Sequence, residues 1–262
     1  MQQPDTLVFF LGGHDLEMVT IRDLLVEVAP DRLYDKGLSW GAKASAYREE
    51  ITQTLARGFT PVLVELSDDL NLTPGQCLIV DHHGEQAGEN KPTSLHQVFA
   101  LLRLPPGRWT RWLELVTAND RGYVPAMLEG GASQEEIIQV READRAAQGI
   151  TPEEEAVGAR AVATAENSAD GLLTIVHLPH SRTATVADRL QPELGGPGYK
   201  NLLVYCPDQV NFFGAGEMVL ALEKHFPGGW YGGALPARGF WGHSAPMPDV
   251  LPILLSCSEK AA

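Results

Sequence analysis

The first 100 residues alternate between short apolar runs and longer stretches in which apolar residues recur at helical spacing. The apolar runs have the length of strands and lie at Leu7–Leu11, Pro61–Leu66 and Cys77–Val80, with a weaker run at Arg32–Tyr34. The helical patterns cover residues 16–28, 42–57 and 94–102. Strands that alternate with helices predict a parallel sheet covered by helices on both faces.

A different pattern begins after residue 107. Helices are expected at 108–117, 133–148 and 151–165, and Ser133 with Glu136 forms a capping box at the start of the second. The stretch Asn167-Ser168-Ala169-Asp170-Gly171 is typical of a linker. Strands are then expected at 172–177, 201–206 and 210–213, and helices at 183–190 and 217–226. We therefore predict a parallel-sheet α/β domain at residues 1–166, a linker at 167–171, and a smaller mixed α/β domain at 172–262.

The charge of the chain restricts its partners. Lys and Arg number 20 against 34 Asp and Glu, which gives a formal charge of −14. Affinity for nucleic acid comes mainly from basic side chains that neutralise phosphates, so long nucleic acid is not an expected partner. A small phosphorylated molecule or a short oligonucleotide remains compatible, because a bound dication can reverse the field locally.

The cysteines and the first residues bear on location. Cys77, Cys206 and Cys257 form no Cys-x-x-Cys pair and lie mostly in apolar runs, as reduced core residues of a cytoplasmic protein do. The first residues lack a basic region, and Leu7–Leu11 is too short for a signal or a membrane span. The sequence thus predicts a cytoplasmic protein without a membrane partner.

Acidic and imidazole side chains follow three of the predicted strands. They are His14, Asp15 and Glu17 after the first strand, Glu65 and Asp68 at the strand that begins at Pro61, and Asp81, His82 and His83 after Cys77–Val80. Ligands of open parallel sheets bind at the carboxyl ends of the strands, which favours a metal centre at this edge. The alternatives are that Asp15 only caps a helix and that His82-His83 lies in an ordinary polar loop.

Asp120 is expected at the carboxyl end of the helix that begins at Arg108. The helix dipole opposes a carboxylate there unless a cation is nearby. Asp120 is therefore a candidate for a further metal ligand, with a plain turn residue as the alternative.

Glycine is dense in the segment that follows residue 227. Glycine permits a ligand to approach the backbone closely, but it also occurs in tight turns. The candidate substrate-binding residues of this segment are Gly228, Gly229, Gly232, Gly233, Arg238 and His243. Trp230, Tyr231 or Trp241 would stack on a base, or else belong to the core.

The triplet Asp81-His82-His83 at a strand end, with acids on the flanking strands and a second α/β domain behind, resembles the DHH phosphoesterase superfamily. That superfamily includes RecJ-like exonucleases, phosphodiesterases of short oligonucleotides and cyclic dinucleotides, and family II inorganic pyrophosphatases. The resemblance implies two manganese ions in the first domain. It also implies a smaller, DHH-associated domain with a glycine-rich signature that closes over the substrate.

The resemblance assigns roles by position. Its metal ligands would be Asp15, Glu17, Glu65, His82 and Asp120. His83 would face the substrate phosphate, and Asp81 would orient its neighbours. The segments Val210–Gly214 and His225–Gly229 match the substrate-binding parts of the smaller domain.

Several positions depart from the family pattern. Leu11 stands where the family has a histidine, which makes His14 a substitute candidate for the metal, and Trp230-Tyr231 stands where a histidine is usual. Glu17 and Glu65 replace aspartates, so Asp68 remains a rival for the middle acid.

The expected function is that of a manganese-dependent phosphoesterase, which hydrolyses a small phosphorylated molecule, nucleotide or short oligonucleotide with a metal-activated water. Mixed imidazole and carboxylate ligands suit manganese better than magnesium, and Mg²⁺ is the other candidate. The number of ions, one or two, and the formation of a homodimer are left open. The alternative is a degenerate member that binds a nucleotide or a partner without hydrolysis.

Overall fold

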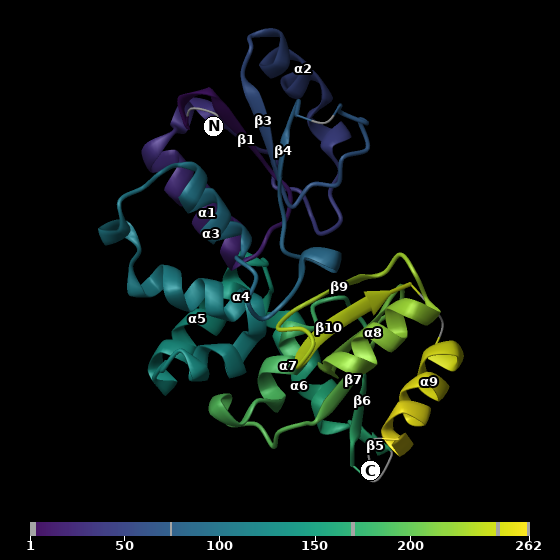
Figure 1. Cartoon of the computed structure of the whole chain (residues 1–262). Coiled ribbons are helices and arrows are strands. Elements are labelled where there is room, and N and C mark those ends of the chain that lie inside the picture. The colour runs from purple at the N-terminus through teal and green to yellow at the C-terminus, as the bar shows by residue number, and fades with distance from the viewer. Residues whose placement is uncertain (1–3, 74, 169–170, 245–246, 261–262) are drawn as a thin grey trace. The chain divides into compact units, whose positions relative to one another are not determined.

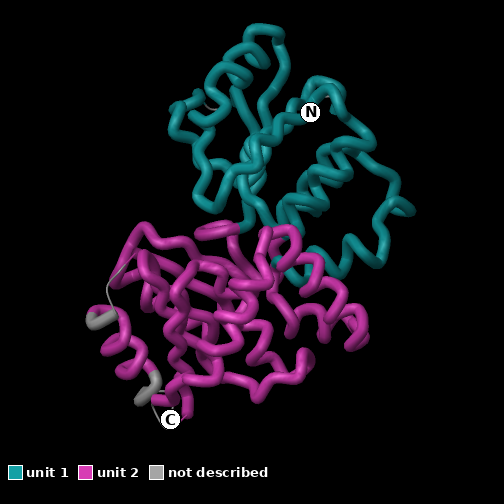
Figure 2. The backbone as a smooth tube through the Cα atoms, turned by 180° about the vertical axis from the view of Figure 1, so that it is seen from behind, with its two compact units in different colours: residues 1–82, 92–120 teal, residues 83–91, 121–262 magenta. Residues whose placement is uncertain are grey.

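A computed structural model describes residues 4–73, 75–168, 171–244 and 247–260. The chain divides into two compact units and crosses between them after His82, Lys91 and Asp120 (Figure 2). Within the described ranges, no helix combines the length and the apolar character that a membrane span requires.

The first unit contains a four-stranded sheet in which all neighbouring strands are parallel (Figure 1). Its spatial order is β2 (Leu33–Asp35), β1 (Leu7–Leu11), β3 (Thr60–Val64) and β4 (Leu78–Val80). Leu11 pairs with Val64, and Val64 pairs with Val80, so β1, β3 and β4 end at the same level. The predicted parallel sheet is confirmed.

Helices cover both faces of this sheet. They are α1 (Leu16–Val28), α2 (Arg48–Ala56) and α3 (Ser94–Leu101), and Figure 1 shows α1 and α3 on one face and α2 on the other. Because side chains alternate along a strand, Val8 and Phe10 of β1 pack with Ile51 of α2, whereas Phe9 faces the opposite side. This two-sided burial explains the continuous apolar runs in the sequence.

The helix α4 (Arg111–Glu129) extends beyond the predicted end at residue 117. It contains a kink at Gly122 (φ −155°, ψ 17°) and Tyr123 (φ 60°, ψ −147°), and Pro125 opens the segment that follows. A proline fits the first turn of a helix but not its interior, so the second segment begins anew after the kink. Asp120 lies at the end of the first segment, as predicted.

The second unit contains the rest of α4, α5 (Gln134–Ala147), α6 (Pro152–Ala163) and a six-stranded sheet. The capping box of Ser133 and Glu136 is present, and Thr151 and Glu154 form another. The strands follow the order β5 (Glu166–Ser168), β6 (Leu173–His177), β7 (Asn201–Tyr205), β8 (Val210–Ala215), β10 (Arg238–His243) and β9 (Trp230–Gly232). Among these strands β6 and β7 pair in parallel and the other pairs are antiparallel, so the sheet is mixed. The predicted mixture of helices and strands is confirmed.

Each face of the mixed sheet has its own apolar core. On one face, Val176 and Val204 pack with Ala161 of α6 and with Val186 of α7 (Ala184–Leu190). On the other, Phe212 and Trp241 pack with residues of α8 (Gly216–His225) and α9 (Met247–Lys260). The hairpin of β9 and β10 and the helix α9 were not among the predicted elements. Single 3-10 turns lie at Pro4–Thr6, Pro30–Arg32, Ala44–Tyr47, Gly84–Gln86, Pro106–Arg108 and Pro192–Leu194.

The predicted linker at 167–171 lies within the second unit. Asn167 and Ser168 belong to β5 and pair with Thr174 and Leu173 of β6, whereas Ala169 and Asp170 lie outside the described residues. The compact units therefore divide the chain elsewhere, and the domain boundaries at 166 and 172 stay a prediction.

Candidate metal centre

Four ionisable side chains of the first unit meet beyond the ends of its strands. Glu17 lies in the first turn of α1, Glu65 follows β3, His82 follows β4 by two residues, and Asp120 ends the first segment of α4. The Nε2 atom of His82 lies 2.6 Å from Asp120 Oδ2 and 3.5 Å from both Glu17 Oε2 and Glu65 Oε1. The sheet order changes direction at β1 and β3, which is where open α/β sheets bind their ligands.

The two oxygens of Glu17 have different surroundings. Oε1 accepts a hydrogen bond of 3.0 Å from the backbone N–H of Leu95 in α3. Oε2 is buried and forms no hydrogen bond with the described residues; it faces His82 instead. One oxygen of the carboxylate is therefore fixed by the fold, and the other is available to a ligand.

Glu65 occupies a left-handed backbone conformation with φ 52°. Such a φ is uncommon for residues other than glycine, and it often occurs at functional sites. The chain after β1 passes directly over this residue, because a Cβ atom on Gly12 would lie 2.1 Å from the Glu65 carbonyl oxygen. The Gly12-Gly13 pair, which the sequence shows only as the end of a strand, thus makes room for the turn that presents Glu65.

Protonation within the cluster follows from its burial and charges. Burial alone would lower the pKa of His82, but the charge of Asp120 and the hydrogen bonds to Asp120 and Glu65 raise it to about 12. Burial, followed by the charge of Asp120, raises the pKa of Glu17 well above its usual range, although His82 opposes this shift. Without an ion, the imidazolium of His82 is thus the cation that offsets the acids.

These residues fit a divalent metal ion. Glu17, His82 and Asp120 each present one ligand atom, and the three atoms lie within 4.8 Å of one another. Three carboxylates surround a single imidazole, and one buried oxygen of Glu17 lacks a hydrogen bond to the described residues. Carboxylate oxygens and an imidazole nitrogen are ligands that manganese accepts.

Three of the predicted metal ligands lie outside this cluster of four. Asp15 is buried and caps α1, because its side chain accepts a hydrogen bond of 2.9 Å from Met18 N. His14 is exposed. Asp68 accepts hydrogen bonds from the backbone N–H groups of Leu70 and Leu72, as a turn residue does. Asp15 thus acts as the helix cap that the sequence analysis named as an alternative.

The two neighbours of His82 have different surroundings. The backbone oxygen of Asp81 accepts a hydrogen bond of 2.9 Å from the side chain of Gln97. His83 belongs to the second unit, where its ring lies edge-on to Phe240 with the ring centres 6.2 Å apart. The proposed roles of Asp81 and His83 therefore remain predictions from the family resemblance.

The glycine-rich segment forms the hairpin of β9 and β10. A Cβ atom on Gly229 would lie 2.6 Å from the Gly242 oxygen, and one on Gly232 would lie 2.9 Å from the Phe240 ring. Gly228 and Gly233 have φ values of 94° and 101°. Close packing and tight turns thus account for these glycines, and their contact with a substrate stays a prediction.

The remaining candidates of the second unit differ in exposure. Arg238 is exposed and donates a hydrogen bond to the Lys200 oxygen. The ring of His243 stacks on Trp241, with the ring centres 5.7 Å apart. Trp241 is fully buried and belongs to the core, whereas Trp230 is 40% exposed and remains accessible to a base.

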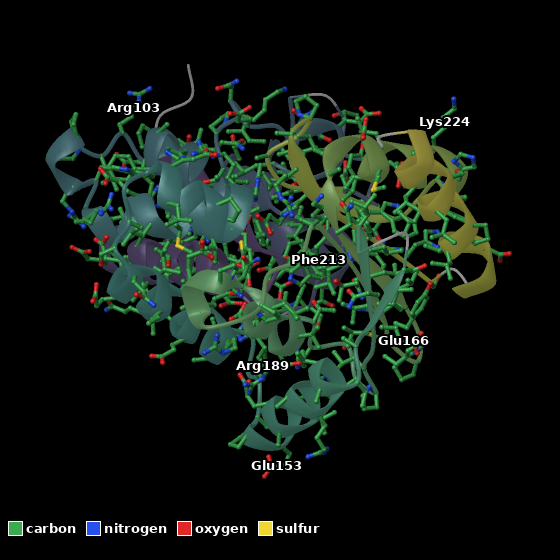
Figure 3. The ribbon with its side chains drawn as sticks, turned by 90° about the horizontal axis from the view of Figure 1, so that it is seen from below. Arg103, Glu153, Glu166, Arg189, Phe213 and Lys224 are labelled. Carbon is green, nitrogen blue, oxygen red and sulfur yellow. The ribbon has the colours of Figure 1, made fainter. Side chains whose placement is uncertain are left out.

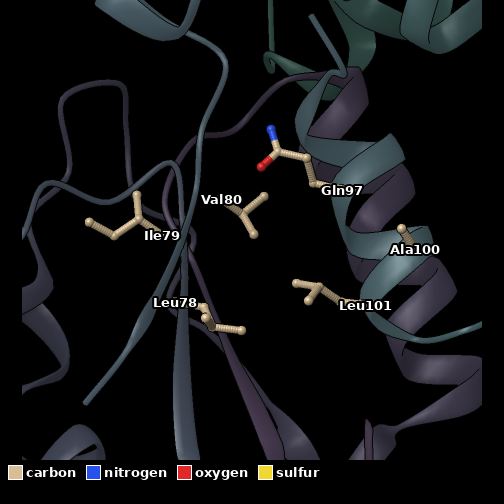
Figure 4. A pocket seen from close by; sticks show the side chains of 6 residues that line it. All are labelled: Leu78, Ile79, Val80, Gln97, Ala100 and Leu101. Carbon is tan, nitrogen blue, oxygen red and sulfur yellow. The ribbon is translucent and has the colours of Figure 1, made fainter. Parts of the chain in front are cut away.

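A hollow of about 310 Å³ lies in the first unit between β4 and α3 (Figure 4). The side chains that line it are labelled in Figure 4 and come from β4 (Leu78, Ile79 and Val80) and from α3 (Gln97, Ala100 and Leu101). These side chains are apolar apart from Gln97. The hollow therefore contributes no ligand to the metal centre.

Sequence reasoning missed two contributions to this centre. One is the glycine pair beside Glu65, and the other is the start of α3, where the Leu95 N–H donates to Glu17. A signal for the second was present, because Thr93 precedes the helical pattern as an N-cap residue would.

No protein-family model matches the sequence, and a search of curated proteins found no match. Among solved structures, RecJ from Thermus thermophilus in complex with Mn²⁺ has a TM-score of 0.53 and 13% identity over 97% of this chain and 52% of RecJ. An exopolyphosphatase-related protein from Bacteroides fragilis has a TM-score of 0.48 and 12% identity, over 98% of this chain and 92% of its own. A pGpG-specific phosphodiesterase from Vibrio cholerae has a TM-score of 0.41 and 13% identity, over 98% of this chain and 100% of its own.

The comparison with RecJ bears on architecture. This chain spans about half the length of the RecJ chain. At an identity of 13%, the similarity is evidence for a shared fold and not for a shared activity. The chain shares the α/β fold of RecJ, and the resemblance to the DHH phosphoesterases predicted from Asp81-His82-His83 is confirmed at the level of the fold.

Proposed function

We propose that this chain is a manganese-dependent phosphoesterase that hydrolyses a small phosphorylated molecule, a nucleotide or a short oligonucleotide. The observation that carries the proposal is the convergence of Glu17, Glu65 and Asp120 on the Nε2 atom of His82. This buried arrangement lies where an α/β sheet binds ligands. The RecJ fold, solved for another protein with Mn²⁺, supports the same reading.

The residues of the proposed site would have two roles, metal binding and contact with the phosphoryl group. The three carboxylates and the His82 imidazole would hold the ion, and the imidazole would lose its proton to do so. When bound, a divalent ion supplies a water of lowered pKa and offsets charge on the phosphoryl group. His83 would donate a hydrogen bond to a phosphoryl oxygen, and Arg238 is a second candidate for that contact.

The first experiment measures bound metal. Purified wild-type protein, loaded with Mn²⁺ and desalted, should retain the ion, whereas His82→Ala and Asp120→Ala should bind it more than about 100-fold more weakly, because removing a ligand costs more than removing its outer-shell support. His14→Ala is the matched control, since His14 is exposed and lies outside the cluster. Equal metal content in all four proteins would contradict the proposed centre.

The second experiment measures turnover. Release of phosphate or mononucleotide from a panel of short substrates should require Mn²⁺, and His83→Ala should lower kcat about 100-fold while metal content stays unchanged. A parallel loss of bound metal in His83→Ala would instead place His83 among the metal ligands.

Binding without hydrolysis is the second candidate function. It is favoured by the position of His14 on the surface, because an exposed His14 leaves fewer ligands for a second ion. A protein that retains Mn²⁺ and binds a nucleotide but turns over no member of the panel would support this function over the first.

A further inference from the structure

The amino end of α3 is capped in an unusual way. Thr93 occupies the N-cap position, where a threonine hydroxyl ordinarily accepts a hydrogen bond from the second or third N–H of the helix. The Thr93 side chain makes no such bond. The N–H of Leu95 instead donates to Glu17 Oε1, from a residue 78 positions earlier in the chain. A carboxylate of the metal cluster thus replaces the local cap.

The Thr93 hydroxyl is used elsewhere. Thr93 is fully buried, and its Oγ1 atom lies 3.2 Å from His96 Nδ1. This contact ties the residue that precedes α3 to a side chain three positions later in the same helix.

The aromatic ring of His96 is itself held in place. It stacks on Trp109, with ring centres 4.5 Å apart and an angle of 25° between the planes. Phe99 meets the same tryptophan edge-on, with the ring centres 4.9 Å apart. The contacts therefore run from Trp109 through His96 to Thr93, at the end of α3 whose Leu95 N–H binds Glu17, all within the first unit.

We propose that the Leu95 N–H is a positioning group for the metal ligand Glu17, and that the contact of Thr93 with His96 holds the helix end that carries this N–H. Together they would fix Oε1 of the Glu17 carboxylate so that Oε2 faces His82 and the ion. This inference rests on the metal centre proposed above. It adds that the affinity of the centre for metal depends on hydroxyl and amide groups that do not touch the ion.

The test uses paired threonine variants of the full chain. Thr93→Val removes the hydroxyl and keeps the shape, whereas Thr93→Ser keeps the hydroxyl. Mn²⁺ affinity, measured from the electron paramagnetic resonance signal of the free ion, should fall about tenfold in Thr93→Val and stay within about twofold of wild type in Thr93→Ser. Thr54→Val is the matched control, because Thr54 is also buried but bonds to Glu50 of its own helix α2.

A second variant isolates the backbone group. Replacing Leu95 by the corresponding α-hydroxy acid turns its amide into an ester and deletes only the N–H. The expected result is again about tenfold weaker Mn²⁺ binding, with a folded protein by circular dichroism.

The outcomes separate this inference from the proposed function. Wild-type affinity in Thr93→Val and in the ester would overturn the inference and leave the metal centre intact. Equal losses in Thr93→Val and Thr54→Val would also overturn it, because they would reflect general destabilisation. A wild-type protein that binds no Mn²⁺ would overturn the metal centre and the inference together.

Discussion

His82 and Glu17 hold protons that a metal ion must displace. The pKa of His82 is raised to about 12 by Asp120 and by the hydrogen bonds around it, despite its burial, and the pKa of Glu17 is raised by burial. Both groups therefore keep their protons to a higher pH than exposed residues do. A ligand nitrogen or oxygen must be unprotonated, so metal binding and proton release are coupled.

The sign of the pH dependence follows from that coupling. Because binding releases protons, Mn²⁺ affinity should rise with pH, by roughly tenfold per pH unit if one proton leaves per ion. Titration calorimetry between pH 6.5 and 8 in two buffers of different ionisation enthalpy measures the protons released. His82→Asn, which carries no titratable group there, should show a shallower slope. A wild-type affinity that is constant over this range would contradict the protonated cluster.

Substitution of Gly12 should also disturb the metal centre, because Gly12 lies against the backbone of Glu65. In Gly12→Ala the new Cβ atom would meet the backbone of Glu65 at 2.1 Å, and backbone cannot move aside as a flexible side chain can. We expect a loss of about 3 kcal/mol in the free energy of unfolding, comparable to overpacking in a core. Urea unfolding measures it, together with Mn²⁺ affinity, which should fall because Glu65 is displaced. Gly107→Ala is the control, since a Cβ atom there meets nothing within 4 Å.

Helices of the second unit are joined by a buried ion network. Arg141 of α5 donates to Asp188 of α7 at 2.9 Å and to Asp144 at 2.9 Å. Its guanidinium lies 4.4 Å from the ring centre of Tyr123, at the kink of α4, and the Tyr123 hydroxyl donates to Asp188. The network thus holds the left-handed backbone of Tyr123 in place from two neighbouring helices.

Breaking this network should be costly. Arg141→Met fills a similar volume but leaves Asp144 and Asp188 with fewer partners in a buried site, and we expect it to lower the free energy of unfolding by about 3 kcal/mol. Arg160→Met on α6 is the matched control, because Arg160 is exposed. Denaturant unfolding of both variants measures the difference. A loss below about 1 kcal/mol in Arg141→Met would show that the arginine contributes little beyond its packing.

The elements of the first unit follow from local patterns, and the details of the site do not. Continuous apolar runs predict buried parallel strands, and parallel strands bring their ends together, so Glu17, Glu65 and His82 are placed at one edge from the sequence. The left-handed turn at Glu65 and the cap that Glu17 gives to α3 depend on residues far apart in the chain. Periodicity contains no information about such contacts, so the sequence could not show which oxygen of Glu17 the fold holds.

The glycine-rich hairpin illustrates the same limit in the second unit. Its glycines interrupt the alternation that marks a strand, so β9 and β10 were not predicted. In the structure, a Cβ atom on Gly229 would collide with the Gly242 oxygen, and a Cβ atom on Gly242 would collide with the Trp230 ring. When the glycines of a strand are required by the packing of a neighbouring strand, the strand can be recognised only once the pairing of the two strands is known.

The charge of the whole molecule bears on the length of its substrate. The formal charge is −14, and acidic side chains such as Glu153 and Glu166 are exposed on its surface alongside Arg189 and Lys224 (Figure 3). Arg189 is partly neutralised by Glu155, with 2.7 Å between the charged atoms. A net charge of this sign opposes the approach of each further phosphate of a long strand.

Affinity should consequently stop rising once a substrate fills the site. In a series of single-stranded oligonucleotides of increasing length, tested with Mn²⁺, kcat/KM should reach its maximum within the first few nucleotides and then level off or fall. The dependence of binding on salt should also be shallow, because the logarithm of affinity falls by about 0.7 per phosphate neutralised for each tenfold rise in salt, and one or two phosphates would be engaged. An affinity that grows with every added nucleotide, with a slope to match, would show a basic track that the overall charge conceals, and the substrate would then be a long strand.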